Sequence, residues 1–269
     1  MNILVTINAN YIKVLVVMLK SLAYNNRHKK IDVYVMNSTL NNDDIKYLCD
    51  NVMRNINIID LKVSDDLLRD APVTKRYPKE MYYRILASYY LPRKVDKILY
   101  LDPDLVVINK LDKLYNMKLN NYYFAAATHI WGVLQTFNRI RLNMRRDSIY
   151  INSGVMLMNI RLLRLEQNMD DVYSFINKNK NKLMLPDQDV ISGLYANKIL
   201  PIDSYVYNLT EKLLVNKRFL PYIDEDWINK NTVIIHYCGK NKPWNKKYKG
   251  KLNKFYKFYD RMDIRSGCK

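Results

Sequence analysis

Short apolar segments alternate with amphipathic segments along the first hundred residues. The apolar runs predict buried strands at 2–7, 31–36 and 56–59, and the amphipathic runs predict helices at 10–23 and 42–53. Asn41 or Asn42 can cap the second helix, because an asparagine side chain accepts a hydrogen bond from the first helical turn. Since strands and helices alternate, we expect an α/β fold with a mixed, mostly parallel sheet flanked by helices.

The pattern continues less regularly towards the end of the chain. A helix is predicted at 79–90 and ends before Pro92, which cannot continue it. Further strands are expected at 97–101, 123–127, 155–158 and 233–236, and a further helix at 187–195. No internal repeat and no linker rich in glycine, serine or proline divides the sequence. We therefore expect one domain over 1–245 and a C-terminal tail over 246–269.

The composition narrows the class of protein. Of the 269 residues, 49% are hydrophobic and 26% charged, which is enough apolar material for a sizeable core and excludes a disordered chain. The 3 cysteines form no Cys-x-x-Cys pair, so neither a disulfide framework nor a cysteine zinc site is supported. This cysteine usage suits a reducing compartment, the cytosol. The apolar run at 14–19 is too short for a membrane span.

The charge of the chain is strongly positive and uneven. There are 44 Lys and Arg against 26 Asp and Glu, a net charge of +18. Residues 240–269 hold 11 of the basic residues and 2 of the acidic ones, so half of the excess lies in this segment. Apolar side chains recur there at helical spacing, at Leu252, Phe255, Tyr256, Tyr259 and Met262.

Two interpretations of this basic amphipathic tail stay open. The helix can lie on an anionic membrane surface, or it can pack its apolar face on the domain and leave its lysines in solvent. Nucleic-acid binding is not expected, because neither an RNP-like pattern nor a helix-turn-helix pattern accompanies the charge.

The common nucleotide-binding loops are absent from the sequence. There is no G-x-G-x-x-G dinucleotide motif, no G-x-x-x-x-G-K-[ST] phosphate loop and no G-x-S-x-G hydrolase motif. If the sheet handles phosphate, it must use a metal ion or side chains instead of a glycine-rich loop.

Three Asp-x-Asp triplets are candidates for holding such a metal ion, at Asp102/Asp104, Asp187/Asp189 and Asp224/Asp226. The first directly follows an apolar strand, at the carboxyl end where open α/β sheets place ligands. Residues i and i+2 of a strand face the same side, so these two carboxylates can converge on one Mg²⁺ or Mn²⁺ that bridges a diphosphate. The alternative is a surface turn with capping aspartates. Asp224/Asp226 lies in a polar stretch and is expected to be solvated or capping.

A second group of candidates follows the last predicted strand. His236 comes directly after its apolar residues, and an imidazole beside two carboxylates shifts the metal preference towards Mn²⁺. Gly239 lets the backbone approach a phosphate, and Lys242 can neutralise one. The alternative is a structural histidine followed by the start of the basic tail.

These residues and four other segments give the sequence a resemblance to glycosyltransferase family 8. That family includes bacterial lipopolysaccharide galactosyl- and glucosyltransferases and is related to glycogenin. Six segments agree in order: 5–11 (VTINANY), 82–85 (YYRI), 102–104 (DPD), 152–159 (NSGVMLMN), 186–189 (PDQD) and 236–244 (HYCGKNKPW). The resemblance covers residues 3–244 and implies a GT-A fold, a UDP-hexose donor and Mn²⁺ (or Mg²⁺) as cofactor.

The resemblance also implies roles for individual residues. Asp102, Asp104 and His236 would be the metal ligands, with Pro103 between the two aspartates. Gly239 and Lys242 would contact the diphosphate. The nucleotide side would be lined by Thr6, Asn8, Asn10, Tyr11 and Arg84, and the donor sugar would face Asn152, Asp187 and Gln188.

Family members transfer the sugar with retention at the anomeric carbon. A double displacement needs a nucleophile on the far face of the sugar, where Gln188 stands by analogy. An amide is a poor nucleophile, and Asp189 or Asp187 would be chemically better. We favour front-face attack by the acceptor hydroxyl, with the departing phosphate as base and Lys242 stabilising its charge.

Two positions depart from the family pattern. Asn8 stands where an acid is common, and His129 stands near the place where a galactose-transferring relative carries an acid. The resemblance therefore leaves the hexose open between glucose and galactose.

Together these observations predict a metal-dependent, retaining hexosyltransferase. It would use a UDP-sugar and a glycan, lipid-linked or protein-linked acceptor, in the cytoplasm or at the inner face of the cell membrane. The alternative is a non-catalytic binding module with a degenerate transferase fold, held at a membrane surface by its basic tail. Three converging metal ligands favour the enzyme, because a binding module does not need them.

Overall fold

The computed structural model describes residues 1–64, 79–215 and 223–263. Within these ranges, seven strands form the main sheet: β1 (Asn2–Thr6), β2 (Ile31–Asn37), β3 (Ile56–Lys62), β4 (Lys97–Leu101), β6 (Phe124–Ala126), β7 (Val155–Asn159) and β8 (Ile199–Pro201). Two more strands, β5 (Leu105–Val107) and β9 (Ile234–His236), pair as a small antiparallel sheet.

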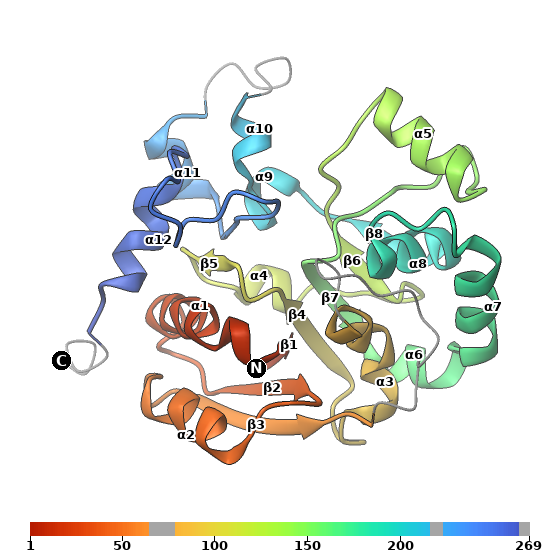
Figure 1. Ribbon diagram of the computed structural model, residues 1–269. Coiled ribbons are helices and arrows are strands. Elements are labelled where there is room, and N and C mark those ends of the chain that lie inside the picture. Colours follow the sequence, from red (N-terminus) through yellow and green to blue (C-terminus); the bar gives the residue numbers. More distant parts are fainter. Residues whose placement is uncertain (65–78, 216–222, 264–269) are drawn as a thin grey trace.

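The strands of the main sheet follow the order β3-β2-β1-β4-β7-β6-β8 (Figure 1). Adjacent strands are parallel except around β7, which runs against both β4 and β6. The predicted mixed, mostly parallel sheet is confirmed. The carboxyl end of β4, which carries the Asp-x-Asp triplet, therefore lies near the middle of the sheet.

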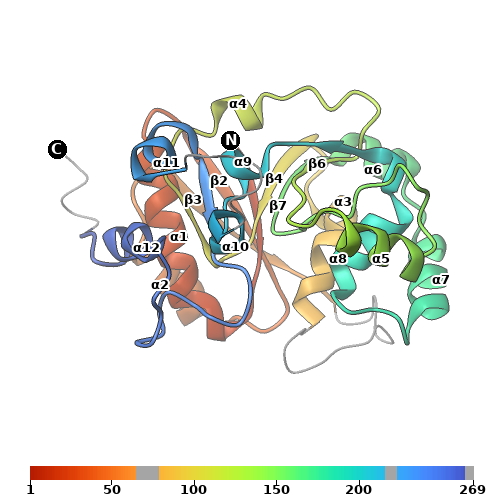
Figure 2. The same ribbon diagram turned by 90° about the horizontal axis from the view of Figure 1, so that it is seen from above.

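Helices cover both faces of the main sheet. The helices of the described residues are α1 (Ile12–Asn25), α2 (Asn42–Asp50), α3 (Ala87–Tyr90), α4 (Asp112–Tyr115), α5 (Val133–Arg141), α6 (Ile160–Glu166), α7 (Met169–Asn179), α8 (Pro186–Leu194), α9 (Ser204–Tyr207), α10 (Glu211–Val215), α11 (Glu225–Asn231) and α12 (Asn253–Asp260). Three short 3-10 helices join them, namely η1 (Ala9–Tyr11), η2 (Lys79–Leu86) and η3 (Ala196–Lys198). Figure 2 shows α1 and α2 on one side of the sheet and α3, α6, α7 and α8 on the other.

Successive side chains of a strand point to opposite faces of the main sheet, and each face has its own hydrophobic core. Ile3 and Val5 of β1 pack in one core with α1, whereas Leu4 between them packs in the other core with η2 and α3. β4 divides its side chains in the same way, with Leu99 on one face and Tyr100 on the other. Both faces are apolar because both are covered, which is the expected condition of a parallel sheet.

Apart from the helix at 79–90, the elements predicted in the first hundred residues are confirmed, with shifted ends. Asn41 is the N-cap of α2, and its side chain accepts a hydrogen bond from the amide of Asp44 in a capping box. The helix predicted at 79–90 needs correction, because residues 79–86 form the 3-10 helix η2 and only 87–90 are α-helical. Five consecutive side chains, 82–86, are buried there, so packing on several sides determines this segment instead of one apolar face.

The predicted C-terminal helix is α12, and its apolar side packs on the domain. Leu252, Tyr256 and Tyr259 are buried in a third cluster that includes Val17 of α1 and Val106 of β5. The Tyr259 hydroxyl accepts a hydrogen bond of 2.7 Å from Asn25 at the end of α1. For these residues the packing interpretation of the tail is the observed one; residues 264–269 lie outside the described ranges.

Candidate active site

The Asp-x-Asp triplet lies where β4 ends and β5 begins. β9 pairs with β5 in a register that sets His236 opposite Leu105, the residue after Asp104. This pairing brings His236 to the two aspartates, and one ligand atom from each residue lies within 4.8 Å of the others. The His236 Nε2 atom is 3.2 Å from Oδ1 of Asp104 and 3.6 Å from Oδ2 of Asp102.

Each aspartate is anchored through one oxygen and presents the other to this cluster. Oδ1 of Asp102 accepts a hydrogen bond of 2.7 Å from the Tyr100 hydroxyl and lies 3.0 Å from the guanidinium of Arg84. Oδ2 of Asp104 is paired with the ammonium of Lys242. The remaining atoms, Oδ2 of Asp102 and Oδ1 of Asp104, face the imidazole.

Two observations test whether a divalent cation fits here. A Cβ atom on Gly154 would lie 2.3 Å from His236 and 2.5 Å from Asp102, so only glycine leaves these ligands in place. The donor set of two carboxylates and one imidazole also suits Mn²⁺, and hard cations such as Mg²⁺ accept its oxygens. The residues present therefore fit such an ion.

The charge on Asp104 is held in a nearly dry environment. Burial by itself would raise the pKa of this carboxyl, but attraction by His236 and Lys242 outweighs burial and holds the pKa below its usual range. Burial lowers the pKa of Lys242, but attraction by Asp104 raises it by more, so the net shift is upward. At neutral pH Asp104 is therefore an ionised carboxylate, the form in which it can ligate a cation.

Asn208 orients the imidazole, although no sequence motif pointed to it. Its Oδ1 atom is 2.9 Å from Nδ1 of His236, and its Nδ2 donates to Oδ1 of Asn152 at 3.0 Å. The contact with Asn208 fixes the ring so that Nδ1 faces the amide oxygen and Nε2 is turned to the aspartates. A partner of this kind on the second ring nitrogen is the usual support for a metal-ligating histidine.

Arg84 joins the two predicted aspartate groups. Besides Asp102, its guanidinium lies 3.2 Å from Oδ2 of Asp187 and donates to the backbone oxygen of Ser153 at 2.9 Å. Burial alone would lower the pKa of Arg84, but the two carboxylates raise it above its usual value. The carboxyl of Asp187 is 1% exposed, accepts from the Ser153 hydroxyl, and has a pKa raised by burial against the opposing effect of Arg84.

Gln188 and Asn152 lie together beside this group. Oε1 of Gln188 accepts from Nδ2 of Asn152 at 3.3 Å and from the amide of Ser153 at 3.4 Å. Because Asn152 also contacts Asn208, a continuous polar chain runs from Gln188 to His236. The structure thus brings the predicted sugar-side residues to the predicted metal ligands.

Asp189 stands apart from this arrangement. Its two oxygens are held by both terminal nitrogens of Arg141 at 2.7 and 2.8 Å, by the Tyr150 hydroxyl at 2.6 Å and by the backbone amides of Met184 and Leu185. The residue is fully buried. Asp189 therefore has the contacts of a structural carboxylate, and this geometry opposes the alternative in which it acts as a nucleophile.

The predicted nucleotide-side residues differ in how closely they approach the cluster. The Thr6 hydroxyl is 2.9 Å from that of Tyr100 and so reaches Asp102 through one residue. Asn8 instead caps η1 by accepting from the amide of Asn10, whose side chain is exposed. Tyr11 has a pKa raised mainly by burial, with Lys242, Asp104 and Asp102 as its charged neighbours.

The closing motif lies over the same end of the sheet. Lys242 donates to the backbone oxygen of Tyr237 at 2.9 Å, which holds its ammonium beside Asp104. Gly239 has φ +107°, a conformation that glycine adopts without strain. The ring of Trp244 lies between Tyr11, at 6.5 Å, and Tyr256 of α12, at 5.8 Å, so the C-terminal helix supports this loop.

The structure also shows the surroundings of His129 and Asp224, whose roles the sequence left open. His129 donates to the backbone oxygen of Asn208 at 2.8 Å, and burial together with His236 lowers its pKa to about 3. A neutral imidazole therefore stands at this position. The Asp224 side chain accepts from the amide of Trp227 at the start of α11, which confirms its expected capping role.

Comparisons with known proteins agree with this architecture. A family model described as glycosyl transferase family 8 matches residues 2–248. A lipopolysaccharide 1,2-glucosyltransferase of Escherichia coli is 28% identical over 245 residues, which cover 89% of this chain and 71% of that protein. A lipopolysaccharide 1,3-galactosyltransferase of Salmonella typhimurium is 24% identical over 190 residues, covering 66% of this chain and 53% of its own length.

Among solved structures, the galactosyltransferase LgtC in complex with donor and acceptor sugar analogs superposes with a TM-score of 0.83. It is 22% identical, and the match covers 97% of this chain and 95% of that one. The glycosyltransferase GlyE of Streptococcus pneumoniae has a TM-score of 0.73 at 20% identity, covering 99% of this chain and 61% of that one.

Fold and family together define a GT-A glycosyltransferase. The chain belongs to glycosyl transferase family 8, and it is a hexosyltransferase. The predicted family and fold are confirmed, and the alternative of a non-catalytic binding module is set aside.

Proposed function

We propose that this enzyme transfers glucose or galactose from a UDP-hexose to a glycan acceptor, with retention at the anomeric carbon, and that transfer requires a divalent metal ion. The convergence of Asp102, Asp104 and His236 carries the proposal, because two carboxylates and an imidazole gathered at one point have a clear use in binding a cation. Mn²⁺ is the expected ion and Mg²⁺ the second choice.

The same three residues would hold the metal, which when bound supplies a Lewis acid for the diphosphate of the donor. The residues around these three ligands hold them in position before any substrate binds. Arg84 and Tyr100 fix one oxygen of Asp102 and so leave the other directed to the cluster. A site whose ligands are fixed by neighbours needs little reorganisation when substrate binds.

Lys242 supplies positive charge for the leaving group. Its ammonium is paired with Asp104 and held by the Tyr237 carbonyl, at the end of the sheet where the diphosphate would lie. A cation in a partly buried site stabilises the charge that develops on the departing phosphate. Gly239, three residues earlier, leaves room for the diphosphate, since a Cβ there would meet no heavy atom within 4 Å.

The contacts made by the carboxylates near the expected donor sugar support front-face attack. Asp187 is paired with Arg84, and both oxygens of Asp189 are occupied. The oxygen of Gln188 already accepts two hydrogen bonds, and an amide is a poor nucleophile. We therefore propose that the acceptor hydroxyl attacks on the face that UDP leaves, with the departing phosphate oxygen taking its proton.

We further propose a lipopolysaccharide-type or other lipid-linked glycan as acceptor, at the inner face of the cell membrane. The activities of the similar lipopolysaccharide glucosyl- and galactosyltransferases support a glycan acceptor, and the net charge of +18 supports attraction to an anionic surface. Attachment would be peripheral; within the described residues, no helix has the length and apolar character of a membrane span.

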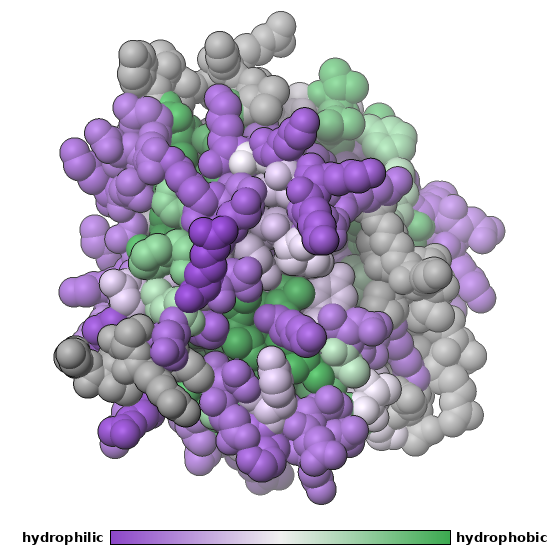
Figure 3. Space-filling view, turned by 60° about the vertical axis from the view of Figure 1, so that its left-hand side comes forward, coloured by the Kyte–Doolittle hydropathy of each residue, from purple (hydrophilic) through white to green (hydrophobic). Residues whose placement is uncertain are grey.

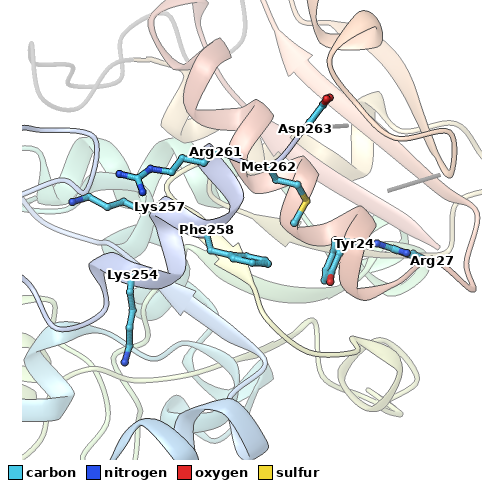
Figure 4. Close-up of a pocket in the computed structure, with 8 residues that line it drawn as sticks. All are labelled: Tyr24, Arg27, Lys254, Lys257, Phe258, Arg261, Met262 and Asp263. Atoms are coloured by element: carbon cyan, nitrogen blue, oxygen red, sulfur yellow. The ribbon is translucent and has the colours of Figure 1, made fainter. Parts of the chain in front are cut away.

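The C-terminal side of the molecule contributes charge to such an attachment. Figure 3 looks onto the side that carries α11 and α12, where hydrophilic side chains cover most of the surface. In the pocket between α1 and α12, Phe258 and Met262 point towards Tyr24, whereas Lys257 and Arg261 point away from it (Figure 4). Because α12 buries most of its apolar face, this side offers mainly positive charge.

The proposal is tested by measuring UDP release from UDP-glucose, UDP-galactose and UDP-N-acetylhexosamines. We expect release with Mn²⁺ from at least one UDP-hexose, loss of release in EDTA, and loss in Asp102→Asn, which keeps the shape of the side chain but removes its charge. Full activity of that variant in EDTA would overturn the metal assignment.

A further inference from the structure

Helix α5 exposes its apolar side chains and buries a polar one, which is the reverse of an ordinary surface helix. A surface helix buries its apolar side chains and exposes its polar ones. In α5 the one buried side chain is Gln135, whereas Val133 is 84% exposed and Ile140 is 76% exposed. Leu134 and Phe137 are 58% and 50% exposed, so four apolar residues lie on the outer side.

The polar side of α5 faces the protein and donates hydrogen bonds to it. Nε2 of Gln135 donates to the backbone oxygen of Ser148 at 3.1 Å, and Nε of Arg139 donates to the same oxygen at 2.7 Å. Arg141, at the end of the helix, binds Asp189. These contacts fix the rotation of the helix, so the outward direction of its apolar side chains is built into the fold.

The spacing of the outer residues makes them one face. Positions 133, 137 and 140 follow the i, i+4, i+7 rule for a single side of a helix, and 134 borders them. Figure 1 shows α5 standing at the rim of the molecule, outside the body formed by β6, β8 and α8. We call these four side chains the α5 face.

Basic residues surround the C-terminal end of this helix. Residues 139–148 and 177–184 contain one acidic residue, Asp147, and six basic residues besides Arg141, which is paired with buried Asp189. The two segments meet where Arg141 donates to the backbone oxygen of Lys182. The exposed side chain of Met184 adds another apolar group, at 56% exposure. An apolar helix face with a basic rim is the combination that binds the interface of an anionic bilayer.

We propose that the α5 face docks this enzyme on an anionic lipid surface, with the apolar side chains entering the boundary between headgroups and acyl chains. A second copy of the chain is a poorer occupant. A nine-residue helix is about 14 Å long and about 10 Å wide, so its face is far smaller than the roughly 800 Å² per partner of a standard protein interface. Binding to a bilayer requires no such minimum contact area.

The position of α5 in the chain connects docking to the active site. The segment between β6 and α5 contains His129, which contacts the backbone of Asn208, the residue that orients His236. Docking would therefore hold the loop beside the metal ligands close to the headgroups, where a lipid-linked acceptor presents its sugar. This last consequence rests on the proposed function, whereas docking itself does not.

The test is co-sedimentation of the full chain with vesicles of phosphatidylglycerol and phosphatidylcholine. The variant V133S/I140S removes two apolar side chains that contribute no buried contact to the fold. Its partition coefficient should fall on the order of tenfold or more, because transfer of either side chain from water into an apolar phase is favourable. The matched control L165S alters a leucine on α6 that is 74% exposed and should bind like the wild type.

Insertion can be followed independently through Trp131, which lies just before α5 and is 39% exposed. Its emission should shift to the blue when anionic vesicles are added, and W131F should lose that shift. Wild-type binding equal to that of V133S/I140S would overturn the proposal, as would no binding at all. A dimer in light scattering that the double variant abolishes, without vesicle binding, would assign the face to a second copy instead.

The activity assay separates this proposal from the previous one. Release of UDP from UDP-hexose without lipid should be equal in the wild type and in V133S/I140S, because the α5 face lies outside the donor site. If vesicle binding fails while UDP release persists, the docking proposal is wrong and the proposed function stands. If UDP release fails while the double variant still loses vesicle binding, the proposed function is wrong and the docking proposal stands.

Discussion

Four aspartates lie in and around the active site, and their hydrogen bonds give them different capacities. Asp102 and Asp104 each keep one oxygen directed to His236, so these two can accept a cation. Asp187 contacts Arg84 and Ser153 through Oδ2, whereas its buried Oδ1 has no hydrogen-bond partner among the described residues. Asp189 has no unoccupied oxygen. At the scale of single residues, the contacts of each carboxylate therefore say more about its role than its place in an Asp-x-Asp triplet.

Asp189→Asn tests the structural role of that residue. The change keeps the shape of the side chain but leaves the guanidinium of Arg141 without a counter-charge in a buried site. Loss of one partner of a buried ion pair costs about 3–5 kcal/mol, so we expect a comparable decrease in the free energy of unfolding, measured by urea denaturation. A variant of unchanged stability that has lost all transfer would show instead that Asp189 is the nucleophile.

Single residues also mark the limit of prediction from sequence. The spacing of Asp102 and Asp104 after an apolar strand pointed to a metal site, because i and i+2 side chains share one side of a strand. Asn208 carried no such signal, since its role arises only when it meets His236, 28 positions away. The need for glycine at position 154 likewise depends on neighbours that only the fold brings there.

At the scale of elements, the small sheet is what completes the site. β5 begins directly after Asp104, and its pairing with β9 brings in His236 from the far end of the sequence. Behind this sheet, Tyr237 and Trp244 lie 5.6 and 5.8 Å from the ring of Tyr256 on α12. The C-terminal helix thus supports the loop that carries Lys242.

Tyr256→Ala tests this support. The ring is 3% exposed, and deleting a buried aromatic side chain costs about 3 kcal/mol, so the urea midpoint should decrease markedly. Phe258→Ala is the matched control on the same helix, because Phe258 is 55% exposed and its loss should change stability by no more than about 0.5 kcal/mol. Equal effects of the two variants would mean that α12 is not packed as described.

The elements that sequence patterns missed are mostly the shortest or the least regular. β5 and β8 have three residues each, too few to show a period of two. Helix α5 has a regular apolar pattern, but its apolar residues point outwards, so the usual inference from pattern to core fails there. The longer runs at β1, β2 and β4 were predictable because each is buried on both faces.

At the scale of the whole molecule, the fold separates three kinds of surface. The carboxyl end of β4 holds the metal ligands, α12 carries positive charge, and the α5 face is apolar. The basic excess of the tail was visible in the sequence, but its apolar residues could not be assigned to membrane or core without the packing of α12. The structure assigns those of the described segment to packing and leaves α5 as the apolar docking surface.

Titration with Mn²⁺ in the presence of UDP, followed by the electron paramagnetic resonance signal of the free ion, measures directly whether Asp102, Asp104 and His236 hold a metal ion. We predict one tightly bound ion per chain and at least about tenfold weaker binding in Asp104→Asn, which removes a ligand charge. Asp226→Asn alters an exposed aspartate of another Asp-x-Asp triplet and should bind like the wild type. Wild-type affinity in Asp104→Asn, or no bound Mn²⁺ in the wild type, would contradict the proposed metal site.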